Sequence, residues 1–317
     1  MKITVLDGYA LNPGDLSWQA FESLGEVQVH NRVAPNGIIE AALEADVLLT
    51  NKTPLSAATL EALPNLKYIG VLATGHNVVD SIAARARGIP VTNVPSYGPE
   101  SVAQMAIAHV MNISRQVAHH ASTVRNFRWA QNQDFCYWDF PQIELTGKTL
   151  GIIGLGTIGL ATAKIAQALG MKILANRKSA QPMPEGIENA SLDQIFEQSD
   201  FISLHCPLTE DTEKLVNQER LKQMKSTAFL INTSRGQLID EGALFQALKD
   251  HRIAGAGLDV LTQEPPASDN PLFTLGNCHI TPHIAWATQA ARRRLMDTAA
   301  QNLTSWMQGT PTNVANL

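Results

Sequence analysis

Cysteine is scarce in this 317-residue chain, and its scarcity excludes two kinds of framework. The three cysteines, Cys136, Cys206 and Cys278, form neither a CxxC pair nor an even-numbered set. The sequence therefore predicts neither a disulfide scaffold nor a zinc site, and no metal is expected. A reducing cytoplasm fits this cysteine usage best.

Positive charge is also in short supply. The chain has 24 Lys+Arg against 29 Asp+Glu, a formal net charge of -5, and this balance offers no electrostatic footprint for a polyanion. We therefore expect no nucleic-acid partner. Charged residues make up 17% and hydrophobic residues 44% of the chain, which is typical of a folded globular protein rather than a disordered one.

Long apolar runs are missing as well. The most apolar stretches, near residues 102–113 and 149–155, are interrupted by polar residues or glycines, and they fall short of the roughly 20 residues that cross a bilayer. The N-terminal MKITVLDGYA reaches Asp7 before an apolar stretch of signal-peptide length forms. We expect neither a membrane partner nor a secretion signal.

What the sequence does contain is a regular alternation of short β-rich runs with longer helix-patterned segments. This alternation is typical of βαβ units around parallel sheets, and the length favours two domains. A first series of predicted strands covers residues 3–7, 27–30, 47–50, 68–72 and 91–94. A second series covers residues 150–153, 172–175, 201–205, 228–232, 257–260 and 279–281. The predicted fold class is α/β, with two Rossmann-like doubly wound parallel-sheet domains.

The two series also set the domain boundaries. We assign residues 1–98 plus 288–317 to a first domain and residues 99–287 to a second. Residues 100–120 predict one long hinge helix between the two series, because apolar residues recur there at helical spacing.

Two further segments lie outside the predicted strands. Residues 122–141 are rich in aromatic side chains without a clean period, which predicts an arm or loop, and a dimer contact is one use for it. Residues 288–306 predict a helix, whose run Arg292-Arg293-Arg294 indicates a solvated or inter-domain face.

A glycine motif opens the second domain. Gly154-Leu155-Gly156-Thr157-Ile158-Gly159 follows an apolar strand and begins a predicted helix over 157–169, the context in which GxGxxG predicts dinucleotide binding. The first glycine allows a tight turn, the second lets the backbone approach a pyrophosphate, and the third lets helix and strand pack closely. The phosphates would then lie at the helix N-terminus. The alternative is a purely structural turn.

The end of the next strand indicates which dinucleotide binds. An NAD site usually has an acidic residue about 20 residues after the glycines, but this strand ends in Asn176-Arg177-Lys178-Ser179. Arg177 can bind a phosphate bidentately, Lys178 adds a point charge and Ser179 a hydroxyl. We predict that NADP(H) is preferred, with NAD(H) and a merely solvated basic turn as the alternatives.

Four motifs follow the second half of this sheet. They are Asn232-Thr233-Ser234-Arg235-Gly236, Gly257-Leu258-Asp259-Val260, Glu264-Pro265-Pro266 and Thr281-Pro282-His283-Ile284. With these motifs in this order, the sequence resembles the D-2-hydroxyacid dehydrogenase family, specifically its glycerate dehydrogenase (hydroxypyruvate reductase) branch. The resemblance covers nearly the whole chain. It implies a substrate (catalytic) domain, a dinucleotide-binding domain and an active site in the cleft between them.

The resemblance implies catalytic roles for Arg235, Glu264 and His283. Reducing a 2-oxo acid needs a cation for the substrate carboxylate, a proton donor for the forming alkoxide and a hydride from nicotinamide. An arginine offers the fixed donor fork that suits a carboxylate, and a histidine can give or take a proton near neutrality. Glu264 would hold the imidazole and favour its charged form. Taken singly, each residue has an ordinary structural alternative, and His76 is a rival base.

The same resemblance implies further contacts. Asp259 would meet the nicotinamide carboxamide, and the cofactor would be lined by Cys206, Pro207, Thr233 and Ser234.

On the substrate side, backbone N–H groups of Thr74, Gly75 and His76 would meet the substrate carboxylate. The family often has Gly-Ser where this chain has Ala285-Trp286. A bulky Trp286 would reduce the pocket, which is consistent with a small substrate.

The implied activity is hydride transfer between NAD(P)H and a small 2-oxo acid. Hydroxypyruvate, giving D-glycerate, is the first expectation, and glyoxylate is a weaker substrate. Another D-2-hydroxyacid dehydrogenase, of the glyoxylate, D-lactate or phosphonate type, remains an alternative, as does a dinucleotide-binding corepressor. We expect a homodimer.

Overall fold

A computed structural model of the chain, which describes residues 1–178 and 181–316, divides into two compact units. Unit 1 comprises Met1–Gly98 and Trp286–Leu317, and unit 2 comprises Pro99–Ala285. Residues 286 and 287 thus group with unit 1. Within the described residues, every helix is too short or too polar to cross a membrane.

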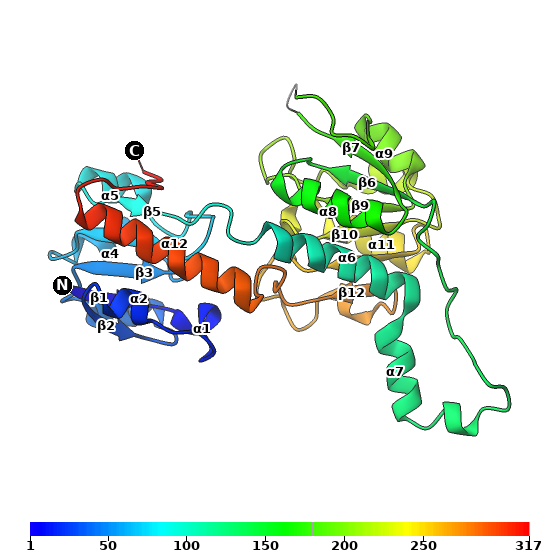
Figure 1. Ribbon diagram of the computed structural model, residues 1–317, viewed down its shortest axis with the longest axis horizontal. Coiled ribbons are helices and arrows are strands. Elements are labelled where there is room, and N and C mark those ends of the chain that lie inside the picture. Colours follow the sequence, from blue (N-terminus) through cyan, green and yellow to red (C-terminus); the bar gives the residue numbers. More distant parts are fainter. Residues whose placement is uncertain (179–180, 317) are drawn as a thin grey trace. The chain divides into compact units, whose positions relative to one another are not determined.

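Unit 1 is built on a parallel sheet with helices on both faces (Figure 1). Its strands are β1 (Lys2–Val5), β2 (Glu26–Val29), β3 (Val47–Thr50), β4 (Tyr68–Val71) and β5 (Val91–Thr92). Its helices are α1 (Gly8–Leu11), α2 (Gln19–Glu22), α3 (Ile38–Ala42), α4 (Ala57–Glu61), α5 (Ser81–Ala86) and α12 (Gln289–Met307). The described strands are ordered β2-β1-β3-β4-β5. One apolar cluster lies beneath α3, α4 and α5, and a second beneath α1, α2 and α12.

The strands of this sheet read as apolar runs because both of its faces are covered. Every residue of β3 and of β4 is buried.

One charged side chain of α12, that of Arg292, is also buried. The sequence predicts a solvated or inter-domain face for the run Arg292-Arg293-Arg294; Arg293 and Arg294 are exposed, but for Arg292 the prediction is wrong. The Arg292 side chain is 7% exposed and donates to both carboxylate oxygens of Asp15, at 2.8 and 2.6 Å. The hydrogen bonds from Arg292 lower the pKa of Asp15.

Unit 2 contains the larger parallel sheet. Its strands are β6 (Thr149–Ile153), β7 (Lys172–Asn176), β8 (Ile187–Asn189), β9 (Phe201–Leu204), β10 (Phe229–Asn232), β11 (Gly255–Leu258) and β12 (Cys278–Ile280). Its helices are α6 (Pro99–Arg115), α7 (Val117–Arg125), α8 (Thr157–Ala168), α9 (Leu192–Gln198), α10 (Gln218–Gln223) and α11 (Glu241–Lys249). Helices α6 and α8 pack on one face, and α9, α10 and α11 on the other (Figure 1). The described strands number seven, one more than the six predicted. The additional strand is β8, which was not predicted because only Ile187 in it is buried and its apolar pattern is weak.

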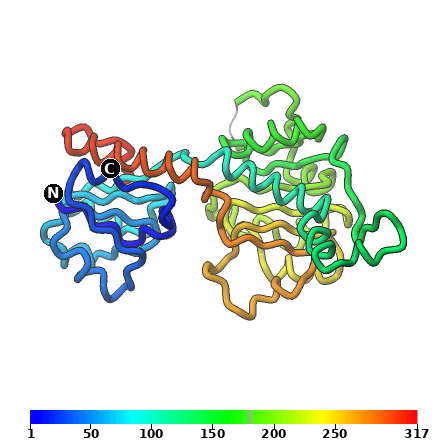
Figure 2. The backbone as a smooth tube through the Cα atoms, turned by 60° about the horizontal axis from the view of Figure 1, so that its bottom comes forward, coloured from blue at the N-terminus to red at the C-terminus, as the bar shows by residue number. Residues whose placement is uncertain are grey.

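The single long helix predicted over residues 100–120 is wrong. Helix α6 ends at Arg115 and α7 begins at Val117. Gln116 between them has a left-handed backbone, with φ at 49°, and such a residue ends a helix even when it is not glycine. The predicted arm therefore begins as helix α7. Figure 2 shows this segment leaving the body of unit 2 and returning to it.

The strand order locates the ligand-binding edge of unit 2. The described strands are ordered β12-β11-β10-β9-β6-β7-β8. The chain thus runs outward from β6 through β7 and β8, then returns to place β9 on the other side of β6. Open α/β sheets bind ligands at the carboxyl ends of the strands beside such a reversal. The GxGxxG motif follows β6 directly, so it lies at this position.

Candidate active site

The glycine loop is shaped by two close backbone contacts. Gly154 has φ at 98° and lies against the turn that follows β9, where an added Cβ would come within 2.5 Å of the Cys206 amide nitrogen. A Cβ on Gly159 would come within 2.3 Å of the Gly154 carbonyl oxygen. Gly156 differs, because no described atom lies within 4 Å of its Cβ position. Two of the glycines are therefore required for packing, and the third leaves its side of the loop open.

The residues around this loop fit a dinucleotide. Helix α8 begins after Gly156, which supplies no side-chain cap, and the first N–H groups of a helix lack partners within it and attract anions. On the turns after β9 and β10, His205 Nδ1 and Thr233 Oγ1 are buried without a hydrogen-bond partner among the described residues. Open space, uncapped N–H groups and orphaned polar atoms together suit a pyrophosphate and its attached sugars.

The predicted cofactor-lining turns lie side by side. Ser234 Oγ donates to the carbonyl oxygen of Cys206 at 3.3 Å, which connects the turn after β10 to the Cys206-Pro207 turn after β9. Burial raises the pKa of the Cys206 thiol and lowers the pKa of His205 to about 4. His205 Nε2 lies 2.8 Å from Ser203 Oγ. Both Cys206 and His205 are therefore neutral near pH 7.

The predicted 2′-phosphate site follows β7. The Arg177 guanidinium donates to Gln181 Oε1 at 2.7 Å and to the Pro182 carbonyl at 3.3 Å. Lys178 is exposed and lies 2.9 Å from Asp211. Ser179 falls outside the described residues.

A short contact joins two of the three predicted catalytic residues. His283 Nδ1 lies 2.6 Å from Glu264 Oε2, and Glu264 Oε1 accepts the Leu261 N–H at 3.1 Å. The two side chains are 31% and 35% exposed, so solvent and small ligands can reach them. His283 has a left-handed backbone, with φ at 54°.

The third predicted residue, Arg235, lies on the turn after β10. The carbonyl of Arg235 accepts from Asn232 Nδ2 at 2.8 Å, and the exposed guanidinium donates to the Ser234 carbonyl at 2.7 Å. A Cβ on Gly236 would come within 2.0 Å of the Leu261 carbonyl carbon. The turn that contains Arg235 therefore packs directly on Leu261, whose N–H binds Glu264.

Asp259 is the most fully bonded side chain near this site. It has no exposed surface, and its Oδ1 accepts from Thr281 Oγ1 at 2.6 Å and from the Ile284 N–H at 3.0 Å. Its Oδ2 accepts from the Ala285 N–H at 2.7 Å. One carboxylate thus binds the Thr281 hydroxyl before His283 and two backbone N–H groups after it. Sequence reasoning missed these bonds and the part played by Thr281, although both residues follow strand ends.

The predicted substrate residues of unit 1 lie on a fixed loop after β4. Thr74 Oγ1 donates to the Val94 carbonyl at 2.9 Å, and the Thr74 carbonyl accepts from Asn93 Nδ2 at 2.7 Å. Thr74 and Gly75 are exposed. His76 Nδ1 is buried without a hydrogen-bond partner among the described residues, so the rival base lacks the carboxylate contact that His283 has.

Trp286 packs edge-on against Tyr97, with 6.4 Å between the ring centroids. Both residues belong to unit 1, and both pack against the apolar cluster beneath α12.

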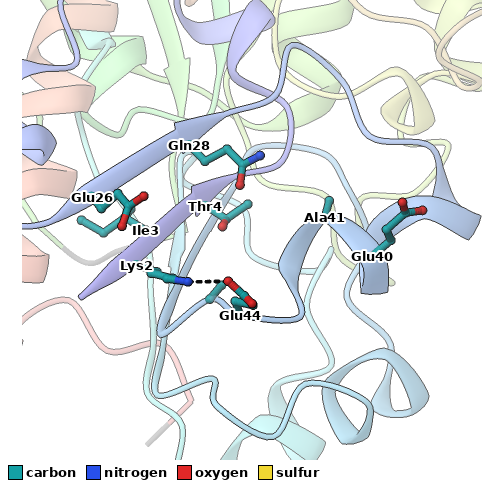
Figure 3. A pocket seen from close by; sticks show the side chains of 9 residues that line it. Lys2, Ile3, Thr4, Glu26, Gln28, Glu40, Ala41 and Glu44 are labelled. Carbon is teal, nitrogen blue, oxygen red and sulfur yellow. Dashed lines mark hydrogen bonds and ion pairs between the residues drawn. The ribbon is translucent and has the colours of Figure 1, made fainter.

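One hollow on the surface of unit 1 does not suit an acidic substrate. It lies beside β1 and β2, where Figure 3 shows Lys2 paired with Glu44, and Glu26 and Glu40 also line it. The hydrogen bond that Lys2 donates to Glu44 raises the pKa of Lys2, so the positive charge of Lys2 is already matched. The described residues contain no group of three His, Cys, Asp or Glu side chains that could hold a metal ion.

Two parallel α/β units, a glycine loop at the sheet reversal and an Arg-Glu-His set on neighbouring turns define a dinucleotide-binding dehydrogenase. Residues 107–285 match the family described as D-isomer specific 2-hydroxyacid dehydrogenase, NAD binding domain. The chain belongs to this family.

Several known proteins are similar to this chain. It is 50% identical over 322 aligned residues to a hydroxypyruvate reductase from Blautia hydrogenotrophica, covering 100% of both chains. It is 44% identical to a glycerate dehydrogenase from Methylorubrum extorquens, covering 88% of each. Among solved structures, the acyclic imino acid reductase Bsp5 in complex with NADPH and D-Arg superposes with a TM-score of 0.84 at 33% identity, covering 99% of each chain.

Proposed function

We propose that this chain reduces hydroxypyruvate to D-glycerate, with glyoxylate as a weaker substrate. The observation that carries the proposal is the 2.6 Å contact between His283 and Glu264, next to the turn that contains Arg235. The 50% identity to a hydroxypyruvate reductase over the full chain supports the choice of substrate.

The chain's own residues divide the reaction between them. Arg235 binds the substrate carboxylate through its two-pronged donor group. When bound, the reduced nicotinamide supplies the hydride that adds to C2 of the substrate. His283 donates the proton that converts the forming alkoxide into a hydroxyl, and Glu264 holds the imidazole by Nδ1 so that Nε2 is the nitrogen presented to substrate. Asp259 stays the predicted partner of the nicotinamide carboxamide. The N–H groups of Thr74, Gly75 and His76 stay predicted substrate ligands.

We also propose that NADPH is preferred over NADH. The turn after β7 has Arg177 and Lys178 where an acidic residue would repel a 2′-phosphate. A similar fold binds NADPH in the imino acid reductase. Ser179 belongs to the same prediction.

Steady-state kinetics test the proposed function. Initial rates with hydroxypyruvate, glyoxylate and pyruvate, each with NADPH and NADH, should give the highest kcat/KM for hydroxypyruvate with NADPH. A protein that binds the dinucleotide but reduces none of the three acids would contradict the proposed function.

A homodimer is the proposed assembly. The arm formed by α7 and the segment up to residue 142 is held together by Asp139, which accepts from Arg128 at 2.5 Å and lies 2.6 Å from His119 Nε2. Large apolar side chains remain exposed on this arm, among them Phe127, Trp129, Phe135 and Trp138. A second copy of the chain would cover this surface.

We place the enzyme in the cytoplasm, which the three free cysteines support.

A further inference from the structure

Helix α6 contains a buried histidine that the proposed reaction does not use. His109 is 4% exposed and packs on Gly257 of β11, where an added Cβ would come within 2.8 Å of His109 Cβ and 2.9 Å of Nδ1. Gly257 therefore leaves the space that the imidazole fills. Burial lowers the pKa of His109, although the nearby Asp259 charge opposes this effect. The ring is accordingly neutral near pH 7.

The hydrogen bonds of His109 have only one consistent direction. Its Nε2 lies 3.1 Å from Thr281 Oγ1, and this oxygen lies 2.6 Å from Asp259 Oδ1. A carboxylate can only accept, so the single hydroxyl proton of Thr281 is donated to Asp259. His109 must then be the donor to Thr281. The hydrogen bonds therefore run from His109, the first donor, through Thr281 to the acceptor Asp259.

This series of hydrogen bonds ends on the loop that contains His283, the proposed proton donor. Asp259 also accepts the N–H groups of Ile284 and Ala285, so one carboxylate binds the side chain of Thr281 before His283 and the backbone directly after it. A left-handed backbone, as at His283, is uncommon for residues other than glycine and depends on its surroundings.

Helix α6 binds the same loop at a second point. Ser101, two turns from His109 on this helix, donates through Oγ to the Ala285 carbonyl at 2.5 Å. Both Ser101 and His109 are buried. One helix thus contacts the loop at Thr281 and at Ala285, on either side of His283.

We propose that His109 is a positioning residue for the proton donor. Through Thr281 and Asp259 it fixes the backbone of residues 281–285, so that the His283 imidazole stays on Glu264. The inference rests on the proposed function and adds to it a residue that touches neither substrate nor cofactor.

Two substitutions separate the donor function of His109 from its packing. His109→Leu keeps a buried side chain of similar size and removes the donor, whereas His109→Gln keeps an N–H donor near the position of Nε2. With hydroxypyruvate, His109→Leu should lower kcat about tenfold and leave the KM for NADPH within about twofold, as expected when one buried hydrogen bond that orients a catalytic group is lost. His109→Gln should restore most of kcat. Equal losses in both variants at unchanged thermal stability would overturn the proposal.

A double-mutant cycle tests the route through Thr281. In a Thr281→Val background, His109→Leu should cause no further loss of kcat, because the hydroxyl that accepts from His109 has already been removed. Losses that multiply would show that His109 acts by another path.

A readout without turnover separates this inference from the proposed function. In protein labelled with 15N at histidine, the His283 ring signals, assigned with His283→Ala, should shift in His109→Leu and remain in place in His109→Gln. If the two variants show these shifts but the wild-type protein reduces no 2-oxo acid, the proposed function is refuted and the positioning role of His109 stands. An active wild type with unshifted His283 signals in His109→Leu would refute the positioning.

Discussion

At the scale of single residues, the proposed chemistry depends on how firmly Glu264 is held against His283. One oxygen of Glu264 contacts the imidazole and the other accepts the Leu261 N–H. This second bond fixes the orientation of the carboxylate. A hydrogen bond to a charged group is stronger than one between neutral groups, so this contact holds the imidazole in place in the proposed reaction.

Replacing this carboxylate by an amide tests its charge. Glu264→Gln keeps the size and an acceptor oxygen but removes the negative charge, so kcat for reduction should fall about 10- to 100-fold while the KM for NADPH is unchanged. Parallel initial-rate series on both proteins measure this. A kcat within twofold of the wild-type value would show that Glu264 does not assist the proton donor.

Replacing Arg235 tests the geometry of carboxylate binding. Arg235→Lys keeps the charge but loses the two-pronged fork, so kcat/KM for hydroxypyruvate should fall by on the order of 100-fold. Near-unchanged kinetics in this variant would remove Arg235 from the substrate site.

Arg177 is predicted to decide the choice of cofactor. A contact to a charged group changes affinity by about ten- to a hundredfold, so the ratio of kcat/KM for NADPH over NADH should reach this range and shrink as salt increases. Arg177→Asp should reverse the preference, because the acid accepts the ribose hydroxyl and repels the phosphate. A wild type that prefers NADH would contradict the prediction.

Residues that pair across long sequence separations could not be predicted. Arg292 and Asp15 are 277 positions apart, and His109 and Thr281 are 172 apart. Nothing local distinguishes either residue from a solvated or structural one. Arg235, Glu264 and His283 were singled out because each lies in a motif after a predicted strand, and the carboxyl ends of parallel strands share one edge.

At the scale of elements, the long apolar strands and helices were predictable and the weak ones were not. Strand β3 was predicted with its observed bounds, because Val47–Thr50 is three apolar residues followed by a β-branched threonine. Strand β8 was missed, since only one of its three residues is buried. The break at Gln116 was missed because no glycine or proline marks it. Both failures occur where the three-dimensional packing, rather than the local pattern, decides the structure.

Three histidines whose pKa is lowered by burial predict a pH-dependent stability. Burial lowers the pKa of His205 to about 4 and also lowers the pKa of His109 and of His279. The unfolded chain then binds more protons than the folded one below about pH 6.5. The free energy of unfolding should therefore fall as the pH drops from about 6.5 toward 4, by up to about 3 kcal/mol for His205 alone.

Urea unfolding at pH 7.5 and pH 5 measures this loss. The pH range stays above the region where the carboxylates titrate, so the histidines dominate the difference. His205→Gln, which keeps an N–H near Ser203, should reduce the pH dependence. Equal stability of the wild type at the two pH values would contradict the prediction.

At the scale of the whole molecule, the exposed aromatic arm predicts association. Phe135 is 88% and Trp138 is 66% exposed, and large apolar side chains gathered on one projecting segment are typical of an interface. The double substitution Phe135→Ser and Trp138→Ser should convert a dimer into a monomer, as measured by light scattering after size exclusion. A monomeric wild type would show that the arm has another use.

The central claim is that this chain is a hydroxypyruvate reductase whose proton donor is His283. The most direct measurement is the initial rate of NADPH oxidation with hydroxypyruvate for the wild type, His283→Ala and His76→Ala, with NADPH binding followed separately by fluorescence. The account predicts turnover by the wild type, a loss of at least about 100-fold in His283→Ala with NADPH binding retained, and a smaller loss in His76→Ala. No turnover by the wild type, or a larger loss in His76→Ala than in His283→Ala, would contradict it.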